Sequence, residues 1–419
     1  MKNKFILKNT RVEDNTIFYD YEITGEWEKY FNQEEKYYVR YSENIDNVDV
    51  SILNIPLISS FIILAWICDA EIICETIDED FYNSLTEVKN GFLDIHNSDI
   101  FKGGKLVVEK LKNNKINDNN SIALFSGGVD ANTTFFRHSK ENVELCCIWG
   151  ADVNVDNKKG WDIVENFVSE VSKNVNHKYI TIKNPFRKFL NEKKCDELAL
   201  KIANVNWYFG FEHSLAMLGS LAPYNFKNGI KNIYIASSYT PDDIGTVPCA
   251  SDPRVDENIC YFGCNINHDG YELNRQQKVS YLCSVKKEIE KDINLRVCWK
   301  TEKGDNCCNC EKCYRTIMGL YVEGENPQTW GFNINDKTYR KIKKFMQYRM
   351  VYSNEDGTIA EWKYIRDGLL ERKELFINDK NINWMIPYPL EEIRNHGILK
   401  YTFKFREFLK KIRNLIINK

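Results

Sequence analysis

Short apolar segments alternate with longer stretches of helical periodicity between residues 121 and 299, and this alternation constrains the fold more than any other feature of the chain. The expected strands are Ser121–Phe125, Glu144–Trp149, Tyr179–Ile182, Ile233–Ala236 and Leu295–Trp299, and the expected helices include Trp161–Val175, Cys195–Leu221 and Asn274–Glu290. Apolar runs of this length are typical of buried strands. Repeated strand–helix units predict an α/β fold with a doubly wound parallel sheet, which binds ligands at the carboxyl ends of its strands.

The two ends of the chain lack this alternation. Residues 1–115 combine strand-like segments with apolar helices and predict a small α+β domain, joined to the sheet domain by the polar stretch Lys112–Asn120. We expect the sheet domain at residues 116–325 and a helical C-terminal region at 326–419. The expected outer elements are strands Lys4–Glu13, Thr16–Trp27, Tyr37–Tyr41 and Glu71–Thr76, and helices Pro56–Cys68, Asp78–Phe92, Asp336–Met350, Ile359–Phe376 and Tyr401–Lys419.

The composition excludes several classes of protein. The chain has 57 lysines and arginines against 60 aspartates and glutamates, a net charge of -3, so no overall basic field favours nucleic acid as a partner. Its longest apolar run, Phe61–Cys68, is too short to span a membrane, and its N-terminal residues do not resemble a secretory signal. We therefore expect a soluble cytoplasmic protein without a membrane partner.

The sequence Ser126-Gly127-Gly128-Val129-Asp130 lies directly after an expected strand and directly before a helix. Adjacent glycines let the backbone turn tightly and present N–H groups to an anion, and the helix adds its positive N-terminal end. The hydroxyls of Ser126 and of Thr133 or Thr134 can donate to phosphate oxygens, whereas Asp130 has the charge of a magnesium ligand. The alternative is an ordinary tight turn without a ligand.

Five of the 14 cysteines lie within residues 298–313. Cys298, Cys307, Cys310 and Cys313 have the spacing C-x8-C-x2-C-x2-C, which can place four thiolates around one ion. Four protein ligands close a zinc site, so the metal would be structural; an iron–sulfur cluster is the alternative. Cys308 is a spare thiol beside a ligand.

The glycine loop and the cysteine cluster together resemble a known family. Ser126–Asp130 is similar to the PP-loop of N-type ATP pyrophosphatases, and the cysteine spacing followed by Arg315 looks like the zinc motif of the 7-cyano-7-deazaguanine synthase (QueC) family. The resemblance covers roughly residues 119–325. A longer QatC-type subgroup, found in bacterial antiphage systems, also carries an extra N-terminal domain, and the segments Cys310–Thr316 and Ser237–Gly270 look closest to it.

This resemblance implies a ligase that uses ATP, Mg²⁺ and a structural Zn²⁺. Its relatives convert a carboxylate, 7-carboxy-7-deazaguanine, into an acyl-adenylate with release of pyrophosphate, and an amine then attacks. The acceptor amine would be ammonia or an amino group of a partner protein. Carried over by position, the residues that bind pyrophosphate and magnesium are Ser126, Gly127, Gly128, Val129, Asp130 and Thr133, and those beside adenine and ribose are Trp149, Gly150 and Asp152.

Candidate residues for the carboxylate substrate come from later in the chain. Ser237 and Ser238 follow the fourth expected strand and would face the glycine loop across a cleft. Arg254 could neutralise the substrate carboxylate, although a surface ion pair is an equal alternative. Arg315 and Lys312, held by the zinc segment, are candidate catalytic cations beside Asp130.

Three features leave other interpretations open. The final serine of the PP-loop motif is Ala131 here, which is compatible with a subunit that binds nucleotide without turnover. ATP-dependent tRNA thiolation is a further alternative, with Cys249 or Cys260 as the persulfide carrier. In Glu212-His213, the histidine is either a catalytic group or a hydrogen-bonded core residue. His268-Asp269-Gly270 either binds an anion or forms a turn that His268 caps.

Overall fold

The computed structural model describes residues 2–96, 99–298, 305–348, 356–388, 390 and 405. The chain forms two compact units, one made of Met1–Glu272 with Trp299–Asp305 and the other of Leu273–Cys298 with Asn306–Lys419. The boundaries expected after residues 115 and 325 do not coincide with this division. The boundary expected after residue 115 falls inside the first unit because one sheet contains strands from both sides of it.

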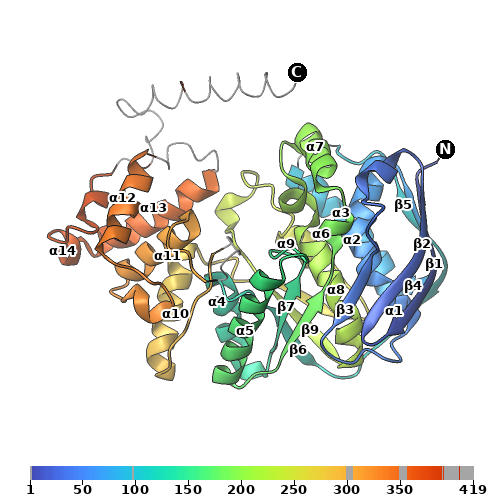
Figure 1. The fold of residues 1–419 in the computed structure, drawn as a ribbon, viewed down its shortest axis with the longest axis horizontal. Coiled ribbons are helices and arrows are strands. Elements are labelled where there is room, and N and C mark those ends of the chain that lie inside the picture. Colours follow the sequence, from blue (N-terminus) through green and yellow to red (C-terminus); the bar gives the residue numbers. More distant parts are fainter. Residues whose placement is uncertain are drawn as a thin grey trace. The chain divides into compact units, whose positions relative to one another are not determined.

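The first unit is built on one ten-stranded sheet with the order β10-β9-β6-β7-β8-β3-β2-β1-β4-β5. Figure 1 labels most of these strands and the helices around them. Its strands are β1 (Lys4–Glu13), β2 (Thr16–Thr24), β3 (Tyr38–Tyr41), β4 (Glu71–Asp78), β5 (Lys105–Lys112), β6 (Asn120–Leu124), β7 (Glu144–Trp149), β8 (Tyr179–Lys183), β9 (Ile230–Ala236) and β10 (Asn265–Asp269). Strand pairs are antiparallel from β8 through β3 and β2 to β1, and parallel elsewhere. The expected α/β fold with a mostly parallel sheet is therefore confirmed.

Helices cover both faces of the parallel strands β6 to β10. Successive residues of β6 show why, since Ile122 and Ala123 are both fully buried but belong to different apolar cores. Side chains alternate between the two faces of a strand, so a strand buried on both faces needs a helical layer on each. On one face lie α4 (Val129–His138) and α5 (Lys158–Val175). On the other lies α8 (His213–Lys227), and α2 (Ile55–Cys68) packs on α8.

The N-terminal strands extend this sheet. β3 pairs with β8 through Arg40 with Lys183 and Tyr41 with Ile182, and the Tyr41 hydroxyl donates to the carbonyl of Ser220 at 2.9 Å. An edge strand exposes unpaired backbone groups, so β3 satisfies the groups that β8 would otherwise leave open. The expected α+β segment thus shares its sheet and its core with the residues after 115.

The apolar helix α2 is buried over nearly its whole length, as its sequence predicts. It packs on α8 and against β4 and β5, and Pro56 stands in its first turn, where its missing N–H costs nothing. α3 (Glu79–His96) follows β4 as expected. Among the residues that the structure describes, no helix combines the length and apolar character that crossing a bilayer requires.

The expected strand at Leu295–Trp299 is wrong over its described residues, 295–298, which form no strand. Its backbone groups are satisfied otherwise: Asn306 donates to the carbonyl of Leu295 at 2.6 Å and accepts from the amide of Val297 at 2.9 Å. The fifth parallel strand is β10 instead, which the analysis of apolar runs missed because its sequence, Asn265–Asp269, is mostly polar.

The helix expected at Cys195–Leu221 is interrupted. α7 (Glu192–Ala203) ends at Asn204 in the left-handed region with φ 55°, a single π-helical turn spans Tyr208–Glu212, and α8 follows. Asparagine tolerates this backbone conformation and ends helices for that reason. Near the expected linker, β5 continues to Lys112, and Asn114 is buried, donating to Ser51 and to Asp78.

The second unit is helical over most of its described residues. α10 begins after Asn274, whose side chain accepts from the amide of Gln277 while the Gln277 side chain accepts from the amide of Asn274. The helix expected at 336–350 forms, and the one expected at 359–376 forms with a break at Arg372. The helix expected at Tyr401–Lys419 lies outside the described residues apart from Phe405. The main helices are α10 (Arg275–Ile289), α11 (Glu311–Val322), α12 (Asp336–Tyr348), α13 (Asp356–Glu371) and α14 (Lys373–Phe376).

Candidate functional site

The glycine loop lies at the carboxyl end of β6, between that strand and α4. Gly127 has φ 81°, and a Cβ atom there would approach Cε1 of Phe167 to 2.3 Å. Gly128 is the N-cap of α4 in an extended conformation and has no side chain with which to cap the helix. The backbone therefore requires glycine at position 127, and the N-terminus of α4 with its positive dipole end follows the turn directly.

We expect Gly127→Ala to lower the free energy of unfolding by about 1–3 kcal/mol, because it adds backbone strain and displaces the Phe167 ring. Urea unfolding followed by circular dichroism measures this loss. Gly263→Ala is the matched control, since Gly263 has φ 75° but no atom within 4 Å of an added Cβ. Equal losses in both variants would show that the contact with Phe167 adds nothing.

A side chain of α4 forms hydrogen bonds with the backbone of the glycine loop. The Asn132 amide donates to the carbonyls of Gly127 and Gly128, both at 2.9 Å, and so fixes the turn. The Thr133 hydroxyl is fully buried and donates to the carbonyl of Val129 at 2.9 Å, which occupies the proton that was expected to reach phosphate. Ser126 and Asp130 are half-buried at the loop and in the first turn of the helix.

The carboxyl ends of the parallel strands bring other predicted residues to the same edge as the loop. Gly150 follows β7 with φ 119°, and a Cβ atom there would lie 1.8 Å from the carbonyl oxygen of Asn184 after β8. Ser237 follows β9; its amide donates to the Asp269 carbonyl at the end of β10, and its hydroxyl donates to Tyr239 at 2.6 Å. Ser237 is buried and Ser238 is exposed.

A polar pocket of about 170 Å³ opens beside the ends of β7 and β8. Its lining includes Gly150 and Asp152, which were predicted, and Arg187 and Lys188, which were not. Trp149 stacks on Trp161 with 5.3 Å between ring centroids. The pocket therefore combines cations, a carboxylate and an adjacent aromatic pair at the edge where this kind of sheet binds ligands.

Arg187 lines this pocket but was not predicted as a site residue. Its guanidinium donates to the carbonyl of Ala151 at 2.7 Å, pairs with Glu192 at 2.6 Å and lies 4.2 Å from the Tyr208 ring centroid. The one feature of the sequence that could have indicated Arg187 is its position four residues after the end of β8, near the carboxyl edge of the sheet. Arg254, by contrast, is engaged by both carboxylate oxygens of Asp252 at 2.8 Å, so its predicted contact with substrate would have to replace that ion pair.

Glu212 is fully buried at the end of the π-helical turn, and burial raises the pKa of its carboxyl well above the usual range. π-helical turns within helices are frequent at functional sites. The neighbouring His213 packs edge-on against Tyr208 at 5.1 Å between ring centroids. Glu212 therefore favours the neutral acid, and the catalytic role considered for His213 stays a prediction.

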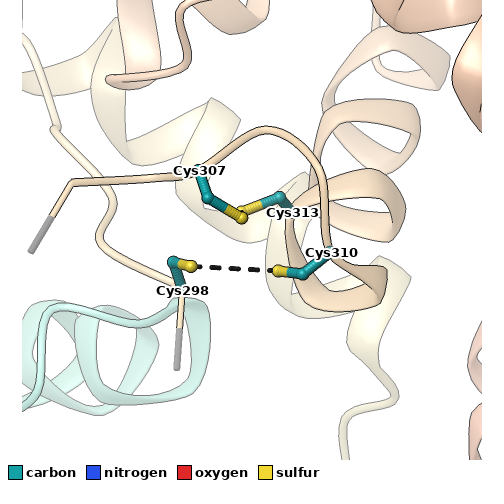
Figure 2. Close-up of side chains that lie close together, drawn as sticks. All are labelled: Cys298, Cys307, Cys310 and Cys313. Carbon is teal, nitrogen blue, oxygen red and sulfur yellow. Dashed lines mark hydrogen bonds between the residues drawn. The ribbon is translucent and has the colours of Figure 1, made fainter. Parts of the chain in front are cut away.

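The four predicted cysteines converge in the second unit (Figure 2). Their sulfur atoms all lie within 4.8 Å of one another, with 3.9 Å between Cys298 and Cys310 and between Cys307 and Cys313. A tetrahedral ion with Zn–S bonds of about 2.3 Å separates its sulfur ligands by roughly 3.8 Å. The group could therefore hold a metal ion such as zinc without large movement.

Local structure explains this convergence. Cys298 ends the segment held by Asn306, Cys307 follows that residue, and Cys310 is the N-cap of α11, one turn before Cys313. A hydrogen bond from the Cys313 thiol lowers the pKa of Cys310 to about 5, whereas burial raises the pKa of Cys307 to about 12.

The remaining predicted cations lie on α11. Arg315 pairs with Glu311 at 3.6 Å and with Glu361 at 3.5 Å, and its side chain is 12% exposed. Lys312 is exposed. Two carboxylates of the same unit thus hold Arg315 in place, and its predicted action toward the glycine loop stays a prediction.

Comparison with known proteins adds no assignment to these sites. No protein-family model matches the chain, and no curated protein matches it.

Proposed function

We propose that the protein is an ATP-dependent ligase that adenylates a carboxylate and passes the acyl group to an amine. The single observation that carries this proposal is the loop Ser126–Gly128, which leaves the central parallel strand β6 and opens the N-terminus of α4. A glycine turn that leads into a helix N-terminus at the carboxyl edge of a parallel sheet fits a chain of phosphates.

In the proposed reaction a carboxylate oxygen attacks the α-phosphorus of ATP, and pyrophosphate leaves. The backbone amides of the loop and of the first turn of α4 would bind the departing pyrophosphate. Asp130 would supply a carboxylate ligand to Mg²⁺, which would offset the negative charge of that group. The product is an acyl-adenylate, a mixed anhydride that an amine can open with loss of AMP.

The carboxylate substrate we propose is 7-carboxy-7-deazaguanine, on the resemblance of the loop and the cysteine cluster to the QueC family. The pocket at Gly150 and Asp152 would accept the ATP nucleoside. Arg187 and Lys188 line the same pocket and would attract phosphate or carboxylate. A bound anion would share these cations with carboxylates that already pair with them, Glu192 with Arg187 and Glu35 and Asp156 with Lys188. The four-cysteine group would hold a structural zinc ion, because four protein ligands leave no open position.

Product analysis tests this proposal. We expect AMP and pyrophosphate from ATP only when 7-carboxy-7-deazaguanine is present, and neither product with 7-deazaguanine, which lacks the carboxylate. ADP and phosphate as products would contradict adenylation. ATP binding without any product would favour the nucleotide-binding subunit.

The thiolation alternative gains little from the cysteines proposed for it. Cys249 is buried, and burial raises the pKa of its thiol to about 12. A persulfide carrier needs an accessible thiolate, so this environment disfavours the role. A hydrogen bond with Cys264 lowers the pKa of Cys260, which leaves Cys260 as the better test residue for that function.

A further inference from the structure

The N-terminal strands β2 and β3 leave one face of the sheet accessible. On one side of these strands, Ile17 and Val39 pair with each other and are fully buried. On the other side, Phe18 pairs with Tyr38, and both aromatic residues are only half-buried. Successive side chains of a strand point to opposite faces, so the aromatic pair belongs to a surface that the core does not use.

Strand pairing extends this surface across four strands. Phe18 stands opposite Tyr38, Arg40 of β3 stands opposite Lys183 of β8, and Lys183 stands beside Trp149 of β7. Paired residues point to the same face of a sheet, and so do Tyr38 and Arg40, which are two positions apart in one strand. These five side chains therefore form one stripe of rings and cations on a single face, here called the aromatic–cation stripe.

The rings and cations of the stripe lie close to one another. The Lys183 ammonium is 4.1 Å from the ring centroid of Trp149 and 5.9 Å from that of Tyr38. A lysine at this distance is attracted to the face of an aromatic ring. Trp149 also stacks on Trp161 of α5, so the helical layer borders the stripe at β7. Arg40 is exposed and Lys183 is half-buried.

The two cations of the stripe are not neutralised by the protein. Arg40 and Lys183 stand directly opposite each other, an arrangement of like charges that destabilises a sheet. Neither side chain forms an ion pair with a described residue. Arg11 of β1, by contrast, pairs with Glu13 and with Asp20 at 2.9 Å each. An anionic ligand would remove the repulsion between Arg40 and Lys183, so charge complementarity favours a polyanion as the occupant of this face.

The aromatic rings decide which polyanion fits. Unpaired bases stack on flat aromatic side chains, while arginine and lysine pair with the phosphates between them. An open sheet face with a few accessible aromatic residues is the surface on which several RNA-binding domains hold single strands. An acidic peptide would satisfy the cations but would leave the rings unused. Because the net charge of the chain is -3, such binding has to be local.

We propose that the aromatic–cation stripe binds a single strand of nucleic acid. Bases stack on Phe18 and Tyr38, and phosphates pair with Arg40 and Lys183. This function does not depend on the proposed adenylation, since none of these four residues was predicted to contact ATP or its carboxylate substrate.

Fluorescence anisotropy with a labelled oligoadenylate RNA of about ten nucleotides tests the proposal. At about 50 mM salt we expect a Kd of about 1–100 µM for the wild-type chain. Phe18→Leu and Tyr38→Leu keep an apolar side chain without a ring, and each should weaken binding about 5-fold or more. Arg40→Gln should weaken binding and reduce the slope of log K against log salt concentration by about 0.7, because one phosphate contact is lost.

Two controls separate lost contacts from lost folding. Arg40→Gln removes the repulsion with Lys183, so its Tm should equal or exceed that of the wild type. Lys110→Gln removes an exposed cation of β5, four strands away from β3 in the sheet, and should bind as the wild type does.

Four results would overturn the proposal. The first is that neither the RNA nor a DNA strand of the same sequence binds to the wild-type chain. The second is that a duplex binds as tightly as the single strand, since stacking on a protein ring needs an unpaired base. The third is that the variants at Phe18, Tyr38 and Arg40 bind as the wild type does. The fourth is that oligoglutamate displaces the labelled strand as well as unlabelled RNA does, which would show binding by charge alone.

Discussion

Asp130→Ala is expected to abolish ATP cleavage and to leave the fold intact. Asp130 stands in the first turn of α4, directly after the glycine loop, and is half-buried there. If it ligates Mg²⁺ on the leaving pyrophosphate, its removal takes away charge stabilisation that is worth about 10²-fold or more in rate. Pyrophosphate release measures the rate, and the Tm from circular dichroism reports whether the fold persists.

Two further variants sharpen this test. Asp130→Asn keeps the shape of the side chain without its charge and should be nearly as inactive as Asp130→Ala. Asp162→Ala removes an exposed carboxylate of α5 that pairs with Lys158, and it should cleave ATP normally. Near-normal turnover of Asp130→Ala would show that this loop does not bind the reacting phosphates.

Replacement of one predicted zinc ligand, as in Cys307→Ser, is expected to remove the metal and to unfold the second unit at much lower temperature. We predict one zinc ion per chain. Binding to structural zinc sites is worth about 10–16 kcal/mol in small peptides, which is comparable to the total stability of a domain, about 5–15 kcal/mol. About 1 kcal/mol shifts Tm by roughly 2–4 °C in domains of 150–250 residues and by more in smaller ones, so the loss should exceed about 10 °C.

Cys308→Ser provides the control beside the site. The Cys308 sulfur donates to the carbonyl of Asn306 at 3.4 Å and is not part of the four-sulfur group, and a serine hydroxyl can make the same bond. We expect it to keep zinc and Tm. Iron with visible charge-transfer absorption, no metal in the fresh protein, or equal losses in both variants would contradict a zinc site at Cys298, Cys307, Cys310 and Cys313.

Elements with local signals could be predicted from the sequence. The strand at Glu144–Trp149 and the buried helix α2 follow from apolar patterns, and the glycine loop follows from two adjacent glycines between a strand and a helix. The cysteine group could be predicted because ligand spacing is itself local. The strand expected at Leu295–Trp299 was predicted wrongly because its backbone partner lies outside the segment. The side chain of Asn306 forms hydrogen bonds with the backbone of Leu295 and Val297 in place of a neighbouring strand.

Features that depend on distant pairing could not be predicted. The N-terminal strands join the parallel strands through the pairing of β3 with β8. These two strands lie far apart in the chain, and neither sequence indicates that the other is its partner. The strand β10 is short and mostly polar, so its place in the sheet depends on β9. The same holds for the hydrogen bond between His268 and Asp256, because only the packing of α9 (Pro253–Asp256) against β10 brings the two residues together.

Isotope transfer tests the central claim, adenylation of a carboxylate, most directly. In the proposed reaction an oxygen of the substrate becomes the bridge between the acyl carbon and the α-phosphorus, and that oxygen leaves with AMP. 7-Carboxy-7-deazaguanine labelled with ¹⁸O in its carboxyl group should therefore give AMP with one ¹⁸O atom, detected by mass spectrometry, and unlabelled pyrophosphate. Unlabelled AMP, or label found in phosphate, would contradict the proposed reaction.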